Sequence, residues 1–215
     1  MISASNASLM YRDHGREVFA CRDVSLEVRE NEFLGILGPS GSGKSSLLYL
    51  LSGLKVPTSG DVAFEGQSLP ALGEEARSRL RLRQFGFVFQ QPYLLGYLSA
   101  LENILIAAPG QDRAKQAQDL LDRLGIGSKS HRQPHELSGG ERQRVCVARA
   151  ILGQPKVIFA DEPTAALDHT NGAGVVEMLN SLRGQGSLVM VTHDESMLGQ
   201  ADRVVRLVDC ELVEA

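Results

Sequence analysis

The chain has 215 residues, a length that suits one domain or a domain with a sub-lobe, and 43% of them are hydrophobic. Its net charge of −4 and its pI of about 5.8 give no electrostatic footprint for nucleic acid. No stretch approaches the roughly 20 apolar residues that span a bilayer, no signal-peptide pattern opens the chain, and the spacing of Cys21, Cys146 and Cys210 favours a reducing compartment.

Apolar periodicity divides the chain into strands that alternate with helices. Strands are predicted at residues 9–11, 24–28, 33–37, 61–65, 85–89, 156–161, 187–192 and 204–208. Helices are predicted at residues 46–51, 74–83, 101–106, 113–124, 142–152 and 170–183. The alternation predicts an α/β fold with a mainly parallel sheet and a ligand site at the carboxyl ends of its strands. The first two strands predict a small antiparallel sheet besides.

Residues 93–129 show helical periodicity without a good parallel strand, which predicts a helical lobe inserted into the α/β core. Ser99 and Glu102 have the spacing of a capping box at the start of its first helix. Asp112 is expected to cap the second helix, which Gly125 ends. Four arginines of the preceding helix are interpreted as a solvated face rather than an anion-binding patch: Arg77, Arg79, Arg81 and Arg83.

A glycine-rich loop joins the strand at 33–37 to the next helix. Gly38, Gly43, Lys44 and Ser45 form the pattern G-x-x-x-x-G-K-[ST] in the strand–loop–helix context of a phosphate-binding loop. Glycines let consecutive N–H groups turn inward, and the helix N-terminus adds about half a positive charge. Lys44 would reach the β- and γ-phosphates of a nucleotide, and the Ser45 hydroxyl would ligate Mg²⁺. An ordinary glycine- and serine-rich turn is the weaker interpretation, because the motif and both flanks agree.

Two adjacent carboxylates, Asp161 and Glu162, follow the apolar strand at 156–161. Adjacent residues leave a strand on different sides, so one can serve a metal while the other faces the substrate. The first acid suits the Mg²⁺ shell of a nucleotide, and the second suits a general base that orients the attacking water. Without the phosphate loop, these two acids would indicate no more than a turn.

A second glycine loop, residues 138–141, precedes the helix at 142–152. Ser138 and Glu141 have capping-box spacing, and the helix start presents N–H groups beside a serine hydroxyl. This arrangement predicts a second anion-binding site. Capping alone would be the default interpretation of an isolated S-x-x-E pattern, but the longer run LSGGERQRV favours a larger role.

The run LSGGERQRVCVARAI, residues 137–151, resembles the signature sequence of ATP-binding-cassette (ABC) ATPases, and the resemblance covers essentially the whole chain. It implies a single ABC ATPase domain over residues 1–215, with a P-loop NTPase core at 1–90 and 150–215. A helical subdomain at 91–149 would carry the signature motif.

The resemblance implies an ATP and Mg²⁺ site built from distant parts of the chain. Catalytic roles fall on Glu162, on the switch histidine His193, on Lys44 and on the Q-loop glutamine Gln90. Mg²⁺ is expected at Ser45, Gln90 and Asp161. Nucleotide contacts are expected from the adenine-stacking aromatic, the Walker A loop, the signature residues and the D-loop (166–168): Tyr11, Gly38, Pro39, Ser40, Gly41, Ser42, Gly43, Lys44, Ser45, Ser46, Ser138, Gly139, Gly140, Glu141 and Asp168.

Within the family, the runs GPSGSGKS, FVFQ, SALENI and DEPTAALD are similar to the cassettes of the lipoprotein-release and macrolide-export class. There the ATPase subunit is a separate chain of about this size. Three positions depart from the usual pattern: Asn31 where glycine is usual, Ser46 where threonine is commoner, and the pair at 165–166. None of these departures from the pattern is expected to change a contact with a phosphate, a metal or the attacking water.

The family further implies a head-to-tail homodimer with each ATP between the phosphate loop of one subunit and residues 138–141 of the other. The residues themselves support this, since one nucleotide has no obvious way to use both helix starts of one chain. The second partner would be an integral-membrane permease in a separate chain, at the cytoplasmic face of the inner membrane. Gln90 and His193 would sense the γ-phosphate, and residues 91–134 would carry the motion to an exporting or mechanotransmitting permease.

Three alternatives remain open. An ABC ATPase of DNA repair would insert a long coiled coil between Ser45 and Asp161, where this chain has only a short helical lobe without sustained heptads, and translation members usually carry two cassettes. A small-molecule kinase would leave residues 137–141 and His193 without a role. A non-catalytic nucleotide-binding scaffold would be indicated by loss of Lys44 or Glu162, and both are present.

Overall fold

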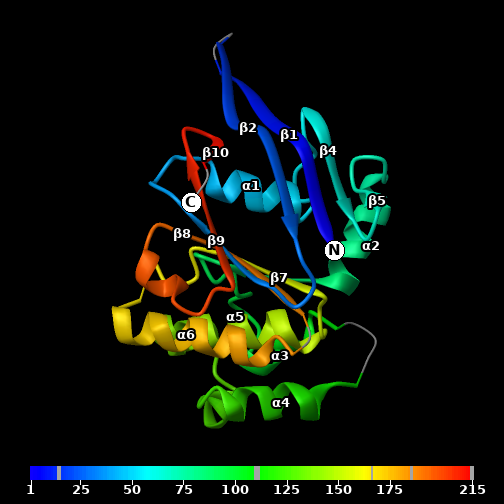
Figure 1. Cartoon of the computed structure of the whole chain (residues 1–215). Coiled ribbons are helices and arrows are strands. Elements are labelled where there is room, and N and C mark those ends of the chain that lie inside the picture. The colour runs from blue at the N-terminus through cyan, green and yellow to red at the C-terminus, as the bar shows by residue number, and fades with distance from the viewer. Residues whose placement is uncertain (14–15, 109–111, 166, 185, 214–215) are drawn as a thin grey trace. The chain divides into compact units, whose positions relative to one another are not determined.

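The computed structural model describes residues 1–13, 16–108, 112–165, 167–184 and 186–213. The chain forms two compact units, one of residues 1–81 and 189–215 and the other of residues 82–188. The boundaries between the units fall inside α2 (Glu74–Gln84) and inside the buried strand β8 (Ser187–Thr192). Figure 1 labels the elements. The partition at residues 90 and 150 that the sequence suggests stays a prediction.

A four-stranded antiparallel sheet opens the first unit. β1 (Ile2–Asp13) lies between β2 (Arg16–Val28) and β4 (Ser59–Phe64), and β4 also pairs with β5 (Gln67–Ser68). β1 and β2 form the long hairpin drawn in dark blue in Figure 1. Both strands are longer than predicted. The added residues of β1 include the buried Ile2, Ala4 and Ala7, whereas the outer residues of β2, 16–18, are exposed and pair with β1 in the hairpin. The inward alternation predicted on β2 is confirmed at Val24, Leu26 and Val28.

The first unit also holds a parallel strand pair. β3 (Phe33–Leu37) is buried along its whole length and pairs in parallel with β9 (Arg203–Val208), which turns back into β10 (Glu211–Val213). α1 (Lys44–Leu51) follows β3 and packs its apolar side on β1 and β2. The short 3₁₀ turn η3 (Glu195–Leu198) lies between β8 and β9.

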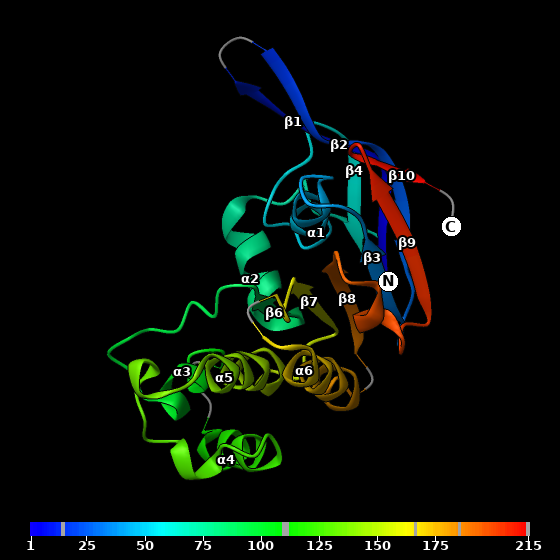
Figure 2. The same ribbon diagram turned by 90° about the vertical axis from the view of Figure 1, so that its left-hand side faces the viewer.

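In the second unit, β6 (Phe85–Phe89) and β7 (Val157–Asp161) pair in parallel. α5 (Gly139–Leu152) contacts β6, α3 (Ala100–Leu105), α4 (Ala114–Arg123) and α6 (His169–Leu182), and Figure 2 shows α5 and α6 side by side. Two 3₁₀ turns lead from α4 to α5, η1 (Gly127–Lys129) and η2 (Pro134–Glu136). The two parallel pairs and the separate antiparallel sheet confirm the predicted α/β fold. Within the described ranges, no helix combines the length and apolar character needed to cross a bilayer.

The helix ends of the lobe test the predicted caps. The capping box of Ser99 and Glu102 at the start of α3 is confirmed. Gly125 ends α4 with a left-handed φ of 71°, also as predicted. The prediction that Asp112 caps α4 is wrong, because the helix begins one residue later. Its N-cap residue is Arg113, and no side chain in the described part of the chain caps it there.

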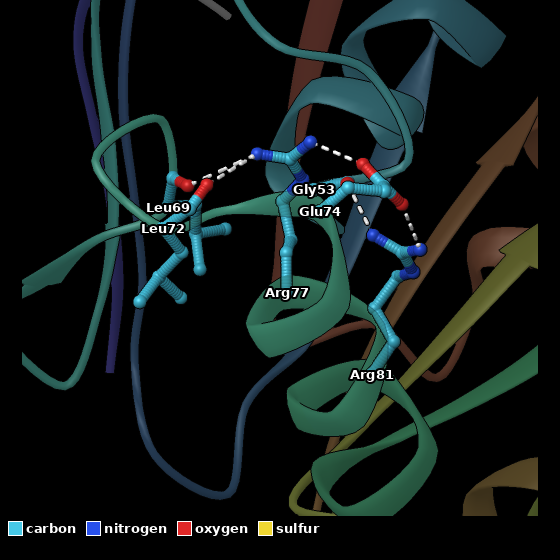
Figure 3. A network of polar contacts seen from close by, with 6 residues as sticks. All are labelled: Gly53, Leu69, Leu72, Glu74, Arg77 and Arg81. Atoms are coloured by element: carbon cyan, nitrogen blue, oxygen red, sulfur yellow. Dashed lines mark hydrogen bonds and ion pairs between the residues drawn. The ribbon is translucent and has the colours of Figure 1, made fainter.

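The interpretation of the α2 arginines as a solvated face is wrong for two of the four. Arg77 is only 10% exposed as a side chain, and its Nη1 donates to the carbonyls of Leu69 and Leu72 at 3.4 and 3.0 Å (Figure 3). Arg81 is 15% exposed and donates to the Gly53 carbonyl at 2.8 Å, and both arginines pair with Glu74. Residues four apart share one helix face, which here turns inward. The other two arginines of α2, Arg79 and Arg83, are exposed, as predicted.

Candidate nucleotide-binding site

The loop between β3 and α1 is tightly wound. Gly41 and Gly43 have φ angles of 81° and 96°, a region that residues with a Cβ rarely adopt. The Ser42 N–H donates to the Pro39 carbonyl at 3.2 Å and closes the turn. α1 then begins at Lys44, with no acidic residue in its first turn. The positive end of the helix is therefore suited to an anion.

Lys44 lies inside this loop. The residue is only 6% exposed, and its Nζ donates to the carbonyls of Gly38 and Pro39, both at 2.9 Å. Two backbone carbonyls thus hold the ammonium group within the loop. The nearby Ser42 hydroxyl is buried and has no hydrogen-bond partner among the described residues.

The β9–β10 hairpin packs against the phosphate loop and forms a wall on one side of it. A Cβ on Gly38 would lie 2.2 Å from the carbonyl oxygen of Leu207 on β9. Cys210, in the turn between β9 and β10, donates its N–H to the Ser42 carbonyl at 3.2 Å. The position of the loop is therefore set by segments distant in the sequence as well as by its own glycines.

Tyr11 and His193 are the other predicted site residues of the first unit. Tyr11 is 44% exposed on β1, and Lys55 Nζ lies 6.0 Å from the centre of its ring. An exposed aromatic ring can stack on a base. His193 is exposed directly after β8, where the Asp194 N–H donates to Thr192 Oγ1 at 3.1 Å and fixes the backbone of the turn.

In the second unit, three predicted residues meet at one strand edge. The register pairs Phe89 with Asp161, so Gln90 and Glu162 leave β6 and β7 at the same level. Asp161 is 6% exposed, and Glu162 is half-buried with a φ of 45°. A non-glycine residue in the left-handed region stores strain, which persists where the surrounding structure over-determines the backbone, as at functional sites. The structure thus brings Gln90, Asp161 and Glu162 together.

The signature loop, residues 138–141, starts α5 with a complete capping box. The Glu141 N–H donates to Ser138 Oγ at 3.3 Å, and the Ser138 N–H donates to Glu141 Oε2 at 2.9 Å, so the predicted capping is confirmed. Lys129 forms an ion pair with the same carboxylate. Hydrogen bonds from Lys129 and from the Ser138 N–H lower the pKa of Glu141, which keeps this carboxyl ionised.

A cavity of about 320 Å³ lies between the starts of α5 and α6. Its lining consists of Ser138, Gly139, Gly140, Glu141, Arg144, Leu167, Asp168 and Asn171. Asp168 caps α6, because its carboxylate accepts the N–H of Asn171 at 3.0 Å and the side-chain amide of Asn171 at 2.6 Å. These bonds lower the pKa of Asp168. The cavity joins the signature loop to Asp168 of the predicted D-loop, whose residue 166 lies outside the described residues.

Two residues with contacts to these groups were not predicted. Gln143 is 3% exposed on α5 and donates to the Phe89 carbonyl at 3.2 Å, which ties the signature helix to the strand that ends before Gln90. The spacing of Gln143, three and four residues from Cys146 and Val147, places it on the apolar face of this helix, which is the sequence signal that could have identified it. Lys129 had no such signal, since it is one of many exposed basic residues.

The phosphate loop, the signature loop and the paired acids Asp161 and Glu162 follow one another along the chain in the order expected of an ABC ATPase. The comparison with known proteins identifies the family. Residues 21–165 match the ABC transporter family, and the chain belongs to that family as an ATP-binding and ATP-hydrolysing subunit.

Two relatives and one solved structure illustrate the likeness. The chain is 42% identical, over 97% of its length, to the lipoprotein-releasing system ATP-binding protein LolD of Hydrogenovibrio crunogenus, of which it covers 94%. It is 43% identical, over 92% of its length, to the macrolide export ATP-binding/permease protein MacB of Nitrosomonas europaea, of which it covers 31%. An ATP-binding cassette solved as a post-hydrolysis dimer with ADP and phosphate has a TM-score of 0.92 and 33% identity, with 100% of this chain and 97% of that chain covered.

Proposed function

We propose that the protein works as a homodimer that closes around two ATP molecules and drives a separate membrane permease. The observation that carries the proposal is the presence of two helix starts suited to anions, at Lys44 in one unit and at Ser138 in the other. Each ATP would lie between the phosphate loop of one subunit and the signature loop of its partner. The relative solved as a dimer with ADP and phosphate supports this arrangement.

The proposed site includes Mg²⁺ held by oxygen ligands. The Asp161 carboxylate and the side-chain oxygen of Gln90 leave adjacent strands at one edge, and Ser45 contributes a hydroxyl from the first turn of α1. Carboxylate, amide and hydroxyl oxygens are the ligands that Mg²⁺ prefers. When bound, the ion would neutralise charge on the β- and γ-phosphates.

The remaining roles follow from where the side chains lie. Lys44 would exchange the carbonyls of Gly38 and Pro39 for phosphate oxygens, while the N–H groups of residues 38–46, of which Pro39 has none, cradle the nucleotide. Glu162 would orient the attacking water as a general base. Gln90 and His193 would sense the γ-phosphate.

The other nucleotide contacts lie at the two ends of ATP. Tyr11 would stack on adenine from one subunit, since its ring is exposed. Residues 138–141 and Asp168 would meet the γ-phosphate side from the other subunit, because they line one cavity.

We infer that the permease partner holds the dimer at the cytoplasmic face of the inner membrane. The chain matches a lipoprotein-releasing system ATP-binding protein along most of its length, and it matches less than a third of a protein named as both ATP-binding and permease. These relatives support an exporting or mechanotransmitting transporter whose permease is a separate chain here. Residues 91–134 of the helical part would pass the motion to that permease.

Glu162→Gln tests the proposal. The variant should lose turnover by about a hundredfold or more, because the general base is gone, yet it should bind ATP and form an ATP-dependent dimer. Phosphate release and analytical ultracentrifugation measure the two properties. The control is Glu177→Gln, an exposed position on α6 that should leave both unchanged. Turnover at the wild-type rate in Glu162→Gln would refute the assignment.

A second variant tests the shared site. Ser138→Arg places a bulky side chain in the cavity at the start of α5, so it should block dimer closure while the monomer still binds nucleotide. ATPase activity equal to the wild type would show that the signature loop does not complete the site.

A further inference from the structure

We infer that Lys129 is a positioning residue for the shared ATP site, and that it neutralises the Glu141 carboxylate so that the start of α5 can accept a polyphosphate. This inference rests on the proposed function, because it takes the signature loop to meet an ATP held by the partner subunit. Lys129 itself is outside the lining of the cavity and would act through Glu141.

The reason for such a residue is the charge of the signature loop. Glu141 lines the cavity together with Asp168, and Arg144 is the one basic residue among the lining residues. Arg144 is partly engaged elsewhere, since its Nη1 donates to the Leu124 carbonyl at 3.3 Å. Like charges lower the affinity of a site for an anion. An uncompensated Glu141 would therefore oppose the ligand that the helix start attracts.

The two carboxylate oxygens of Glu141 have different partners, one in the helix cap and one in the ion pair. Oε2 accepts the Ser138 N–H at 2.9 Å and completes the cap, while Oε1 pairs with Lys129 Nζ. The ammonium group thus compensates the charge without competing for the cap. The Glu141 side chain is 20% exposed and that of Lys129 44%, so solvent screens the pair only in part.

The backbone holds Lys129 in place. It is the last residue of η1, where its N–H donates to the Ile126 carbonyl and its own carbonyl accepts the Arg132 N–H, both at 2.9 Å. Ile126 is buried at 2% exposure, so η1 is anchored in the core of the lobe. The backbone from which the Lys129 side chain reaches Glu141 is therefore held in place.

The chain contains a matched control pair. Glu136 is also the third residue of a capping box, accepting the Gln133 N–H at 2.8 Å on Oε2 and Arg132 at 2.7 Å on Oε1. Its local chemistry is that of Glu141, but neither Arg132 nor Glu136 lines the cavity. If the Lys129 pair served only to stabilise a helix start, loss of either cation would have the same effect.

The test uses the Glu162→Gln protein, in which ATP holds the dimer. We expect Lys129→Met to raise the ATP concentration for half-maximal dimerisation by about tenfold, Lys129→Arg to restore it, and Arg132→Met to change it less than about twofold. Binding of a fluorescently labelled ATP analogue to the dilute monomer should be unchanged in all three Lys129 and Arg132 variants. If Glu162→Gln itself fails to dimerise with ATP, the proposed function fails first, before any Lys129 variant is compared.

A double variant separates neutralisation from a structural role. Glu141→Gln removes the charge and keeps an oxygen for the cap, so adding Lys129→Met to it should change dimerisation by less than about twofold. Added salt should also shrink the effect of Lys129→Met in the Glu141 protein. A full tenfold effect of Lys129→Met in the Glu141→Gln background would overturn the inference, as would an equal effect of Arg132→Met.

Discussion

The Cα of Gly43 faces the backbone carbonyl of Ala20 so closely that a Cβ on residue 43 would lie 2.0 Å from that oxygen. Gly41 has a similar left-handed φ, yet no described atom lies within 4 Å of its Cβ position. Gly43→Ala should weaken ATP binding by roughly tenfold or more, because the loop must shift. Gly41→Ala should add only backbone strain, about 1 kcal/mol of lost stability. Nucleotide titration measures the affinity of each variant, and thermal unfolding measures its stability. Equal losses of affinity in Gly43→Ala and Gly41→Ala would contradict the explanation.

Arg77 and Arg79 separate a buried arginine from an exposed one on the same helix. Arg77→Met removes the guanidinium donor from the carbonyls of Leu69 and Leu72, of which Leu69 keeps the Leu72 N–H at 3.1 Å, and should lower the free energy of unfolding by about 2–3 kcal/mol. Arg79 pairs with Glu75 in solvent, so Arg79→Met should change it by less than about 0.5 kcal/mol. Urea denaturation compares the two variants. Similar values would mean that the network in Figure 3 does not stabilise the unit.

Glu32 predicts a pH dependence of stability. Burial alone would raise the pKa of Glu32, but hydrogen bonds from Arg203 and from the Arg29 N–H outweigh it and hold the pKa below its ordinary value of 4.5. A carboxyl whose pKa is lowered on folding stabilises the protein above its unfolded pKa, and this contribution is lost as the pH falls through the folded pKa. We therefore expect Glu32→Gln to cost about 2–3 kcal/mol at neutral pH and progressively less below 4.5.

Urea denaturation over a pH series measures this difference. Glu30→Gln is the control, because Glu30 is exposed two residues away. A difference between wild type and Glu32→Gln that stays constant from neutral pH to well below 4.5 would refute the linkage.

The three cysteines should differ in reactivity. Burial raises the pKa of Cys21 to about 12 and that of Cys146 to about 11, so neither supplies much thiolate, the form that is alkylated. The pKa of Cys210 is also raised by burial, but this residue is half-exposed. Iodoacetamide should label Cys210 first in the folded protein and all three residues after unfolding, as followed by mass spectrometry. Labelling of Cys146 at the same rate in the native state would contradict this.

Segments with local determinants could be predicted from the sequence. The bounds of β3, β6 and β8 agree with their apolar runs, because polar or glycine residues flank each run. The phosphate loop is likewise local, since its glycines and the strand and helix beside it are contiguous. Asn31 shows the same principle: its φ of 58° explains why glycine is usual there, and asparagine is among the few other residues that tolerate this region. The roles of the site residues stay predictions until the variants are measured.

Features that depend on distant partners could not be predicted. The Gly53 carbonyl that accepts from Arg81 lies 28 residues before it, and the carboxylate that engages Lys129 lies 12 residues after it, at the start of α5. β10 was missed because its turn, Asp209 and Cys210, has two left-handed φ angles without the Asn-Gly pair that usually marks such a turn. In each case the sequence shows the residue but not what surrounds it.

The wall behind the phosphate loop has a consequence for synthesis of the chain. The ribosome makes the complete loop motif early, whereas Leu207 and Cys210, which set its position from behind, are added much later. A nascent chain therefore carries the motif without its support until β9 and β10 have been translated. We therefore expect a chain that ends before β9 to bind nucleotide more weakly than the whole chain, because its phosphate loop lacks these two contacts.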